Sequence, residues 1–150
     1  MSLTFCWSRF DDLSLFDLHD ALHLRSLVFV EEQACAYADV DGRDPDAWHL
    51  LARGDEGVLV AYLRAFAPGA LREEAVIGRV VTAQRRKGLG TKLMEEGLRR
   101  VAHTWPGAPV FVSAQAHLAD WYGRFGFRVS GPGYDEDGIP HVPMVLSPSP

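Results

Sequence analysis

The chain has 150 residues, of which 47% are hydrophobic and 23% are charged, and its formal net charge is −5 at pH 7. This composition excludes a disordered chain and is typical of a globular protein, so we expect one domain over residues 1–150. The negative charge disfavours nucleic acid and anionic membranes as partners. The sequence has no stretch of about 18 apolar residues, so no membrane span is predicted.

The two cysteines, Cys6 and Cys35, have a spacing that fits neither a disulfide scaffold nor a zinc site. The segment 39–50 resembles a calcium loop, but Arg43 takes the fifth ligand position and Leu50 takes the place of the bidentate glutamate. We therefore expect no metal. The N-terminus has no basic stretch before a long apolar run, so no signal peptide is predicted and the expected location is the reducing cytoplasm.

The first half of the chain predicts strands around one long helix. Residues 4–10 are strand-like, and residues 11–33 are helical, with Ser14 and Asp17 in a capping-box pattern. A polar, acidic loop is expected over residues 34–47. The runs 48–53 and 58–67 predict a hairpin across the turn at 54–57. The run 75–82 is apolar on both faces, which indicates a central strand.

An amphipathic helix is predicted from Leu89 onward. One side carries Leu89, Leu93, Met94, Leu98 and Val101, and the other carries Lys92, Glu95, Glu96, Arg99 and His103. Residues 109–114 then predict a buried strand, and residues 117–125 a short helix that ends at Gly126. Two end strands, 127–130 and 141–147, are expected on either side of a loop. The pattern is that of a mixed α/β fold.

A glycine turn precedes the amphipathic helix. Arg85, Arg86 and Lys87 lie side by side at a helix N-terminus, where the helix dipole disfavours cations. Gly88 and Gly90 allow a ligand to approach the backbone, and the free N–H groups of the first turn attract anions. The three cations fit a multiply charged anion such as a pyrophosphate. A glycine turn with solvated charges is the alternative.

Two familiar nucleotide motifs do not fit this turn. A P-loop requires GxxxxGK[ST], but here Thr91 precedes Lys92. A dinucleotide fingerprint requires GxGxxG, but position 93 is leucine.

The turn at 85–90 matches the R/Q-x-x-G-x-G/A signature of GNAT-type N-acetyltransferases. The chain resembles the ElaA-like branch of that superfamily in particular, in the segments 25–33, 37–44, 76–81, 114–127 and 135–141. The resemblance therefore covers nearly the whole chain. It implies a GNAT-type acyl-CoA N-acyltransferase fold, which is a mixed, mostly antiparallel sheet flanked by helices and opened where acetyl-CoA enters.

The resemblance also implies a binding site for acetyl-CoA as cosubstrate. The backbone amides of residues 86–91 would hold the pyrophosphate, and the end of strand 75–82 would pair with the pantetheine arm. Gln115 or His117 stands where many relatives carry an asparagine. The cofactor-binding residues implied are Val80, Val81, Thr82, Arg85, Arg86, Lys87, Gly88, Leu89, Gly90, Thr91, Gln115 and His117.

For catalysis, family members commonly place a tyrosine at the position of Tyr122, where it would protonate the departing thiolate. Tyr122 packing between helix and sheet is the alternative. The Val81 N–H is a candidate to polarise the acetyl carbonyl. Glu32 is the candidate base, acting through water, although a solvated helix end explains it equally well. Its rivals are Glu31, Asp39, Asp41 and His117.

Two acidic loops are expected beside the acceptor, where they would attract a cationic amine. The substrate-binding candidates are Tyr37, Asp39, Asp41, Asp135 and Glu136, although solvated loops are the alternative for each. The predicted function is direct acetyl transfer from acetyl-CoA to a primary amine, small molecule or peptide, in a ternary complex. The alternative is a non-catalytic acyl-CoA-binding module. The chain is expected to be a monomer or a homodimer.

Overall fold

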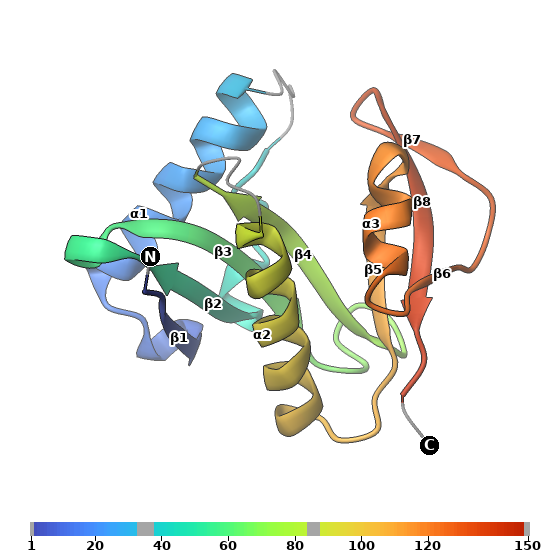
Figure 1. The fold of residues 1–150 in the computed structure, drawn as a ribbon, viewed down its shortest axis with the longest axis horizontal. Coiled ribbons are helices and arrows are strands. Elements are labelled where there is room, and N and C mark those ends of the chain that lie inside the picture. Colours follow the sequence, from blue (N-terminus) through green and yellow to red (C-terminus); the bar gives the residue numbers. More distant parts are fainter. Residues whose placement is uncertain (1, 33–37, 84–87, 149–150) are drawn as a thin grey trace.

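The structure, a computed structural model, describes residues 2–32, 38–83 and 88–148. One mixed sheet has the strand order β1-β2-β3-β4-β5-β8-β6, and β7 pairs with β8 (Figure 1). Every pair is antiparallel except the parallel pair β4–β5. The strands are β1 (Thr4–Arg9), β2 (Trp48–Arg53), β3 (Leu59–Phe66), β4 (Ala75–Thr82), β5 (Val110–Gln115), β6 (Arg128–Val129), β7 (Tyr134–Glu136) and β8 (Ile139–Leu146).

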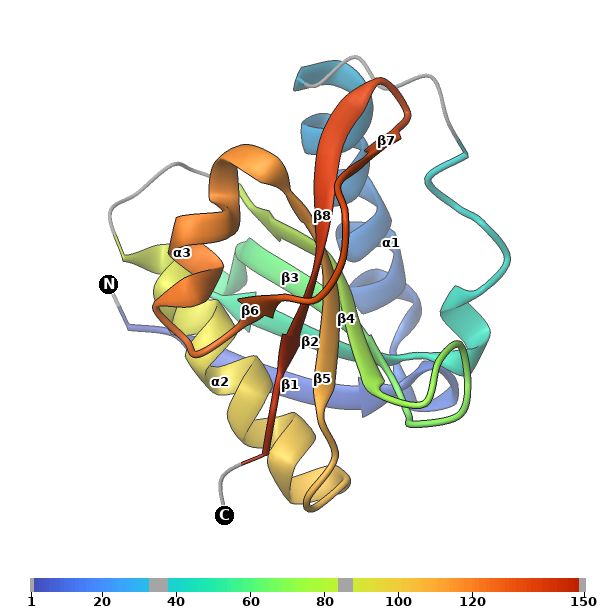
Figure 2. The ribbon, with the colours of Figure 1, turned by 90° about the vertical axis from the view of Figure 1, so that its right-hand side faces the viewer.

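Helices cover both faces of this sheet. Figure 2 shows α2 (Leu89–Thr104) and α3 (Ala119–Gly123) on one side and α1 (Leu15–Arg25) on the other. The wide turns of η2 (Ser26–Glu32) extend α1, and the short turns are η1 (Phe10–Asp12), η3 (Asp44–Asp46), η4 (Asp55–Gly57) and η5 (Ala116–Leu118). Among the described residues, no helix combines the length and apolar character needed to cross a membrane.

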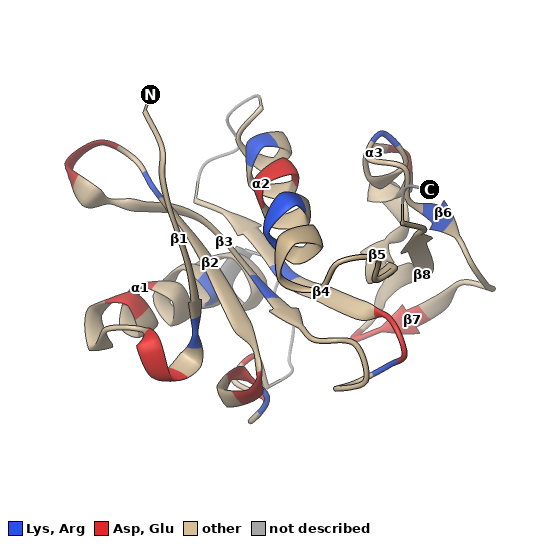
Figure 3. Ribbon diagram, turned by 90° about the horizontal axis from the view of Figure 1, so that it is seen from below, with Lys and Arg blue, Asp and Glu red and all other residues tan. Residues whose placement is uncertain are grey.

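The amphipathic pattern of α2 is confirmed by its packing. Leu89, Leu93, Met94 and Val101 are buried in the larger core cluster, together with residues of β2, β3 and β5. The opposite surface alternates basic and acidic residues, visible as blue and red bands on α2 in Figure 3. Hydrophobic periodicity alone therefore located this helix and its buried side.

Two predicted segments differ most from the structure. The helix expected at 11–33 begins at Leu15, because the Ser14 side chain caps it by accepting a hydrogen bond from the Asp17 N–H at 3.0 Å. The loop expected at 131–140 contains β7, which pairs with β8 through a two-residue turn. Asp137 and Gly138 there have φ values of 53° and 81°. An Asp-Gly pair suits a type I′ hairpin turn, and this signal was missed.

β4 is central, as predicted, and it creates an opening in the sheet. It pairs with β5 only at Ala75↔Val110 and Val76↔Phe111. Beyond those pairs the two strands separate, as Figure 1 shows. On the other side, the register with β3 shifts between Tyr62 and Arg64, a β-bulge at which Arg79 has a φ of 53°. The bulge and the early end of the parallel pairing together open the sheet beside β4.

Candidate active site

A cavity of about 470 Å³ lies in this opening. The cavity exists because β4 and β5 separate and leave a gap between them. Its walls come from segments that are far apart in the sequence. The lining residues that bear on the chemistry are Asp41, Arg64, Arg79, Val80, Ser113, Gln115, Tyr122, Glu136, Asp137 and His141.

The structure brings only some of the predicted site residues to this cavity. Val80, Gln115, Tyr122, Asp41 and Glu136 line it. The other described candidates do not: Val81, Thr82, Gly88, Leu89, Gly90, Thr91, His117, Asp39 and Asp135. Some candidates lie outside what the structure describes: Tyr37, Arg85, Arg86, Lys87 and the side chains of Glu31 and Glu32.

Strand alternation separates the two acidic candidates of β7. Neighbouring side chains of a strand point to opposite faces. Glu136 therefore faces the cavity, whereas the exposed Asp135 before it points away. β7 appears red beside β8 in Figure 3 because of these two residues. Of these two, Glu136 is the one placed to meet a molecule in the cavity.

The backbone of β4 offers Thr82, rather than Val81, to the opening. The Ala83 N–H donates to the Val60 oxygen at 2.7 Å, and the register pairs Ala61 with Thr82 and Tyr62 with Val81. Since hydrogen bonding alternates along an antiparallel ladder, the Val81 N–H points to β3 and the Thr82 N–H points away from it. The Val81 N–H is thus directed at β3 rather than at the opening, and its role at the acetyl carbonyl stays a prediction.

The first turn of α2 has backbone N–H groups that the helix itself leaves without an acceptor. Gly88 is the N-cap with a φ of 89°, and no side chain caps the helix among the described residues. The N–H groups of Leu89, Gly90 and Thr91 have no intrahelical acceptor, by helix geometry. Among the described residues other than its chain neighbours, a Cβ at Gly88 would meet no atom within 4 Å, whereas one at Gly90 would lie 3.4 Å from Trp121 of α3. The open side of Gly88 leaves room for an anion.

Tyr122 is held in place by aromatic packing. Its ring meets Trp121 and Phe127 edge-on, at centroid distances of 4.9 and 5.7 Å. Burial raises the pKa of its hydroxyl to about 12, so the group stays protonated at neutral pH. Its hydroxyl makes no hydrogen bond to another described side chain or backbone group. Tyr122 therefore presents a protonated hydroxyl at the cavity, with no hydrogen-bond acceptor for it among the described residues.

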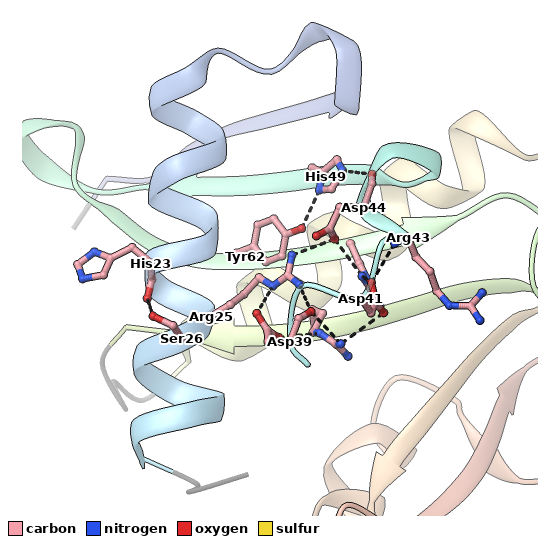
Figure 4. Close-up of polar contacts among 11 residues, drawn as sticks. His23, Arg25, Ser26, Asp39, Asp41, Arg43, Asp44, His49 and Tyr62 are labelled. Carbon is pink, nitrogen blue, oxygen red and sulfur yellow. Dashed lines mark hydrogen bonds and ion pairs between the residues drawn. The ribbon is translucent and has the colours of Figure 1, made fainter. Parts of the chain in front are cut away.

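A buried ionic network lies beside the cavity (Figure 4). Arg25 of α1 is 1% exposed, and its Nε and Nη1 atoms lie 3.0 Å from Asp39 and 2.9 Å from Asp44. Arg64 of β3 contacts the same Asp44 oxygen at 2.9 Å. Buried charges need such partners, because isolated ones would pay the full cost of desolvation.

The same network engages the two aspartates expected to attract the acceptor. Asp41 takes two hydrogen bonds from Arg64, at 2.7 and 3.0 Å, which hold the pKa of its carboxyl well below the usual range. Asp39 is buried, and its Oδ1 lies 2.9 Å from Nε of Arg79. Both negative charges are thus balanced by arginines, so the prediction that they draw in a cation is not supported by their surroundings.

Sequence reasoning missed three residues of this region: Arg64, Arg79 and His141. The two arginines interrupt apolar strands, and a charge in a buried strand requires an acid elsewhere in the chain. The acidic segment 39–46 supplies it. The sequence therefore indicated that these arginines need acidic partners, but it did not indicate which acid pairs with which arginine.

Among the described residues, no group of three His, Cys, Asp or Glu side chains is arranged to hold a metal ion.

Comparisons with known proteins agree with this geometry. Residues 44–148 match the family model of the acetyltransferase (GNAT) domain. Protein ElaA of Escherichia coli is 44% identical over 139 residues, covering 89% of this chain and 90% of ElaA. Its crystal structure superposes with a TM-score of 0.89 at 39% identity, over 97% of this chain and all of that chain.

Two further structures extend the comparison. The crystal structure of an acyl-CoA N-acyltransferase from Pseudomonas aeruginosa has a TM-score of 0.92 and 45% identity, covering 97% of this chain and 100% of that chain. An aminoglycoside 6′-N-acetyltransferase complexed with coenzyme A has a TM-score of 0.71 over 97% of this chain and 99% of its own. At 17% identity, this last similarity concerns the fold alone.

Proposed function

Because the chain belongs to the GNAT acetyltransferase family and is an acyltransferase, we propose that it moves an acetyl group from acetyl-CoA to a primary amine by direct attack in a ternary complex. Its fold is the predicted GNAT acyl-CoA N-acyltransferase fold. The observation that carries the proposal is the opening between β4 and β5, which holds a cavity with Tyr122 on its wall.

The residues around the opening fit acetyl-CoA. The N–H groups of the first turn of α2, from Leu89 to Thr91, would hold the pyrophosphate, with Arg85, Arg86 and Lys87 as supporting charges. The Thr82 N–H, directed away from β3, suits a hydrogen bond with the pantetheine amides. The open side of Gly88 supports the same assignment, since no side chain or backbone atom of the described chain fills it.

Acetyl-CoA supplies a thioester with an electrophilic carbonyl and a thiol leaving group. Tyr122 would donate its hydroxyl proton to the departing sulfur, and its pKa of about 12 keeps that proton available at neutral pH. Deprotonation of the amine requires a base, for which the sequence suggests Glu32 through a water molecule. His117 is exposed and Gln115 lines the cavity, so Gln115 is the better placed of the two to bind the acyl-CoA side.

The acceptor would enter the cavity beside the β7–β8 hairpin. Glu136 and Asp137 line that end, and a carboxylate beside the reacting nitrogen favours a cationic amine. Both a small molecule and the amino group of a peptide are consistent with this recognition.

A direct test measures acetyl transfer by the full chain across a panel of polyamines, amino sugars, aminoglycosides and short peptides. We expect thiol release from acetyl-CoA above its hydrolysis rate with at least one class, and mass spectrometry should show one acetyl group added per thiol released. Tight acetyl-CoA binding without transfer to any amine would favour the alternative, a non-catalytic acyl-CoA-binding module.

A further inference from the structure

The β7–β8 hairpin places four side chains on one face. Its register sets Tyr134 opposite His141 and Glu136 opposite Ile139, so these four point the same way. Across the other edge of β8, His141 is paired with Gln115 of β5. Glu136, Ile139, His141 and Gln115 all line the cavity. The hairpin thus forms part of the wall of the cavity, which Arg79 and Val80 at the bulge of β4 also line.

His141 is held in a defined orientation. Its Nδ1 lies 2.7 Å from the Ile139 carbonyl oxygen, which can only accept, so Nδ1 must carry a proton. The ring of Tyr134 stacks on it at 6.2 Å with an interplanar angle of 17°, and the Tyr134 hydroxyl is hydrogen-bonded to Ser113. Only Nε2 of His141 remains to exchange a proton.

That nitrogen faces a carboxylate. Nε2 of His141 lies 3.3 Å from Oε2 of Glu136. An ionised carboxylate is an acceptor only, so a hydrogen bond between the two groups exists only when Nε2 carries a second ring proton. When Nε2 of His141 takes up a proton, a hydrogen bond to Oε2 of Glu136 can therefore form at the same time. The His141 side chain is 8% exposed and that of Glu136 is 51% exposed, so Glu136 links the pair to the cavity and to solvent.

The other carboxylates near the cavity are less suited to accept a proton. Asp41 is tied to Arg64, and its lowered pKa makes it a weak base. Asp39 is buried against two arginines. Asp137 lines the cavity from the tip of the hairpin turn, without a histidine behind it among the described residues.

We propose that Glu136, positioned by His141, is the base that deprotonates the acceptor amine; this inference rests on the proposed function. An oxygen of Glu136 takes a proton from the ammonium group, and the proton comes to rest on Nε2 of His141. The neutral amine nitrogen forms the bond to the acetyl carbon while the carbon–sulfur bond breaks. Tyr122 gives its proton to the sulfur and then takes one from the nitrogen. The ammonium group thus loses two protons. One ends on the thiol, and the one held by His141 returns through Glu136 to the solvent.

The test measures the rate of acetyl transfer from acetyl-CoA to two nucleophiles. One is the best primary amine of the panel, and the other is an alkoxyamine, which is uncharged at neutral pH. Glu136→Gln should lower kcat for the amine by about 100-fold, since a positioned base typically contributes 10²–10⁴-fold. Asp137 remains at the same end of the cavity to attract the cation, so KM should rise only a few-fold. The alkoxyamine needs no initial deprotonation, so its kcat should fall only a few-fold. Glu95→Gln, the same change on the exposed face of α2, is the matched control and should leave both rates unchanged.

His141→Asn separates positioning from folding, because the asparagine amide can still donate to the Ile139 carbonyl. We expect a loss in kcat of about tenfold for the amine and none for the alkoxyamine, as for other residues that orient a reacting group. Equal losses for both nucleophiles in either variant, or a rise in KM with kcat unchanged, would overturn the base assignment.

Two further variants test whether another carboxylate is the base. If Glu32→Gln or Asp137→Asn shows the amine-selective loss while Glu136→Gln does not, the base lies there instead. A wild-type chain that acetylates neither nucleophile overturns the proposed function itself. Normal wild-type transfer with an unaffected Glu136→Gln variant overturns only the base assignment.

Discussion

Arg79, whose backbone has a φ of 53° in the middle of β4, forms an ion pair with Asp39, with 2.9 Å between Nε and Oδ1. The Arg79 Nη2 also donates to the backbone oxygen of Asp39 at 3.1 Å. The pair ties the bulge of β4 to the acidic segment that follows η2. The strand thus bends where the cavity begins, and an ion pair offsets the backbone strain.

The strain at Arg79 predicts an order of stability between two variants. Both Arg79→Ala and Arg79→Gly remove the ion pair, but only glycine adopts a φ of 53° without a Cβ penalty. We expect the glycine variant to be more stable by about 1–2 kcal/mol, the usual cost of the left-handed region. Urea denaturation of the two variants measures this difference. Equal midpoints would mean that the strand is not strained at this residue.

Arg25 should be far more important for stability than a comparable surface arginine. Arg25→Ala leaves Asp39 and Asp44 buried with less compensation, and breaking such buried pairs costs about 3–5 kcal/mol. The matched change, Arg53→Ala, removes partly exposed pairs with Asp17 and Asp20 and should cost about 1 kcal/mol or less. Chemical denaturation of both variants tests the ranking, and similar losses would contradict it.

The Asp41–Arg64 pair predicts a particular dependence of stability on pH. The folded-state pKa of Asp41 lies below its unfolded value, so the folded protein binds fewer protons there than the unfolded chain. The pair's contribution is complete above about pH 5 and is lost as pH falls below the ordinary aspartate pKa of about 3.9. In thermal melts, Asp41→Asn should therefore be less stable than wild type at neutral pH, and the difference should shrink in acid. A constant difference would argue against the pair.

Gly88 can be tested for its proposed place at the pyrophosphate. Gly88→Val should weaken acetyl-CoA binding at least tenfold in calorimetry, because a side chain at a φ of 89° strains the turn and crowds the approach to the helix N–H groups. Gly107→Val is the matched control, since Gly107 has a φ of 79° in the turn after α2 and equally open surroundings. Unchanged binding by Gly88→Val would remove the pyrophosphate from this turn.

Tyr122→Phe should separate catalysis from binding. The phenylalanine ring keeps the contacts with Trp121 and Phe127 but has no proton to give, so kcat should fall about 10–100-fold while the Kd of acetyl-CoA changes little. Tyr62→Phe, at another buried tyrosine, removes a hydroxyl that bonds His49 and should affect stability more than kcat. Full activity of the Tyr122→Phe variant would assign the proton to another donor.

Local signals in the sequence were sufficient for most elements of the fold. The apolar period of 3.6 residues located α2, and the apolar run at 75–82 identified a central strand, because burial leaves a direct trace in composition. The β7–β8 hairpin was missed although its Asp137-Gly138 turn was present. Its strand is three residues long and polar, so hydrophobic alternation could not reveal it.

The sequence by itself determined the kind of site: a glycine turn between strand and helix, a tyrosine on a following helix, and acidic residues around them. Tertiary structure alone decided which of those acids remain available. Asp39 and Asp41 are matched by arginines from β3 and β4, whereas Glu136 meets His141 across a hairpin. The physical reason is that a carboxylate's chemistry depends on the charges within a few ångströms, and these come from strands that are distant along the chain.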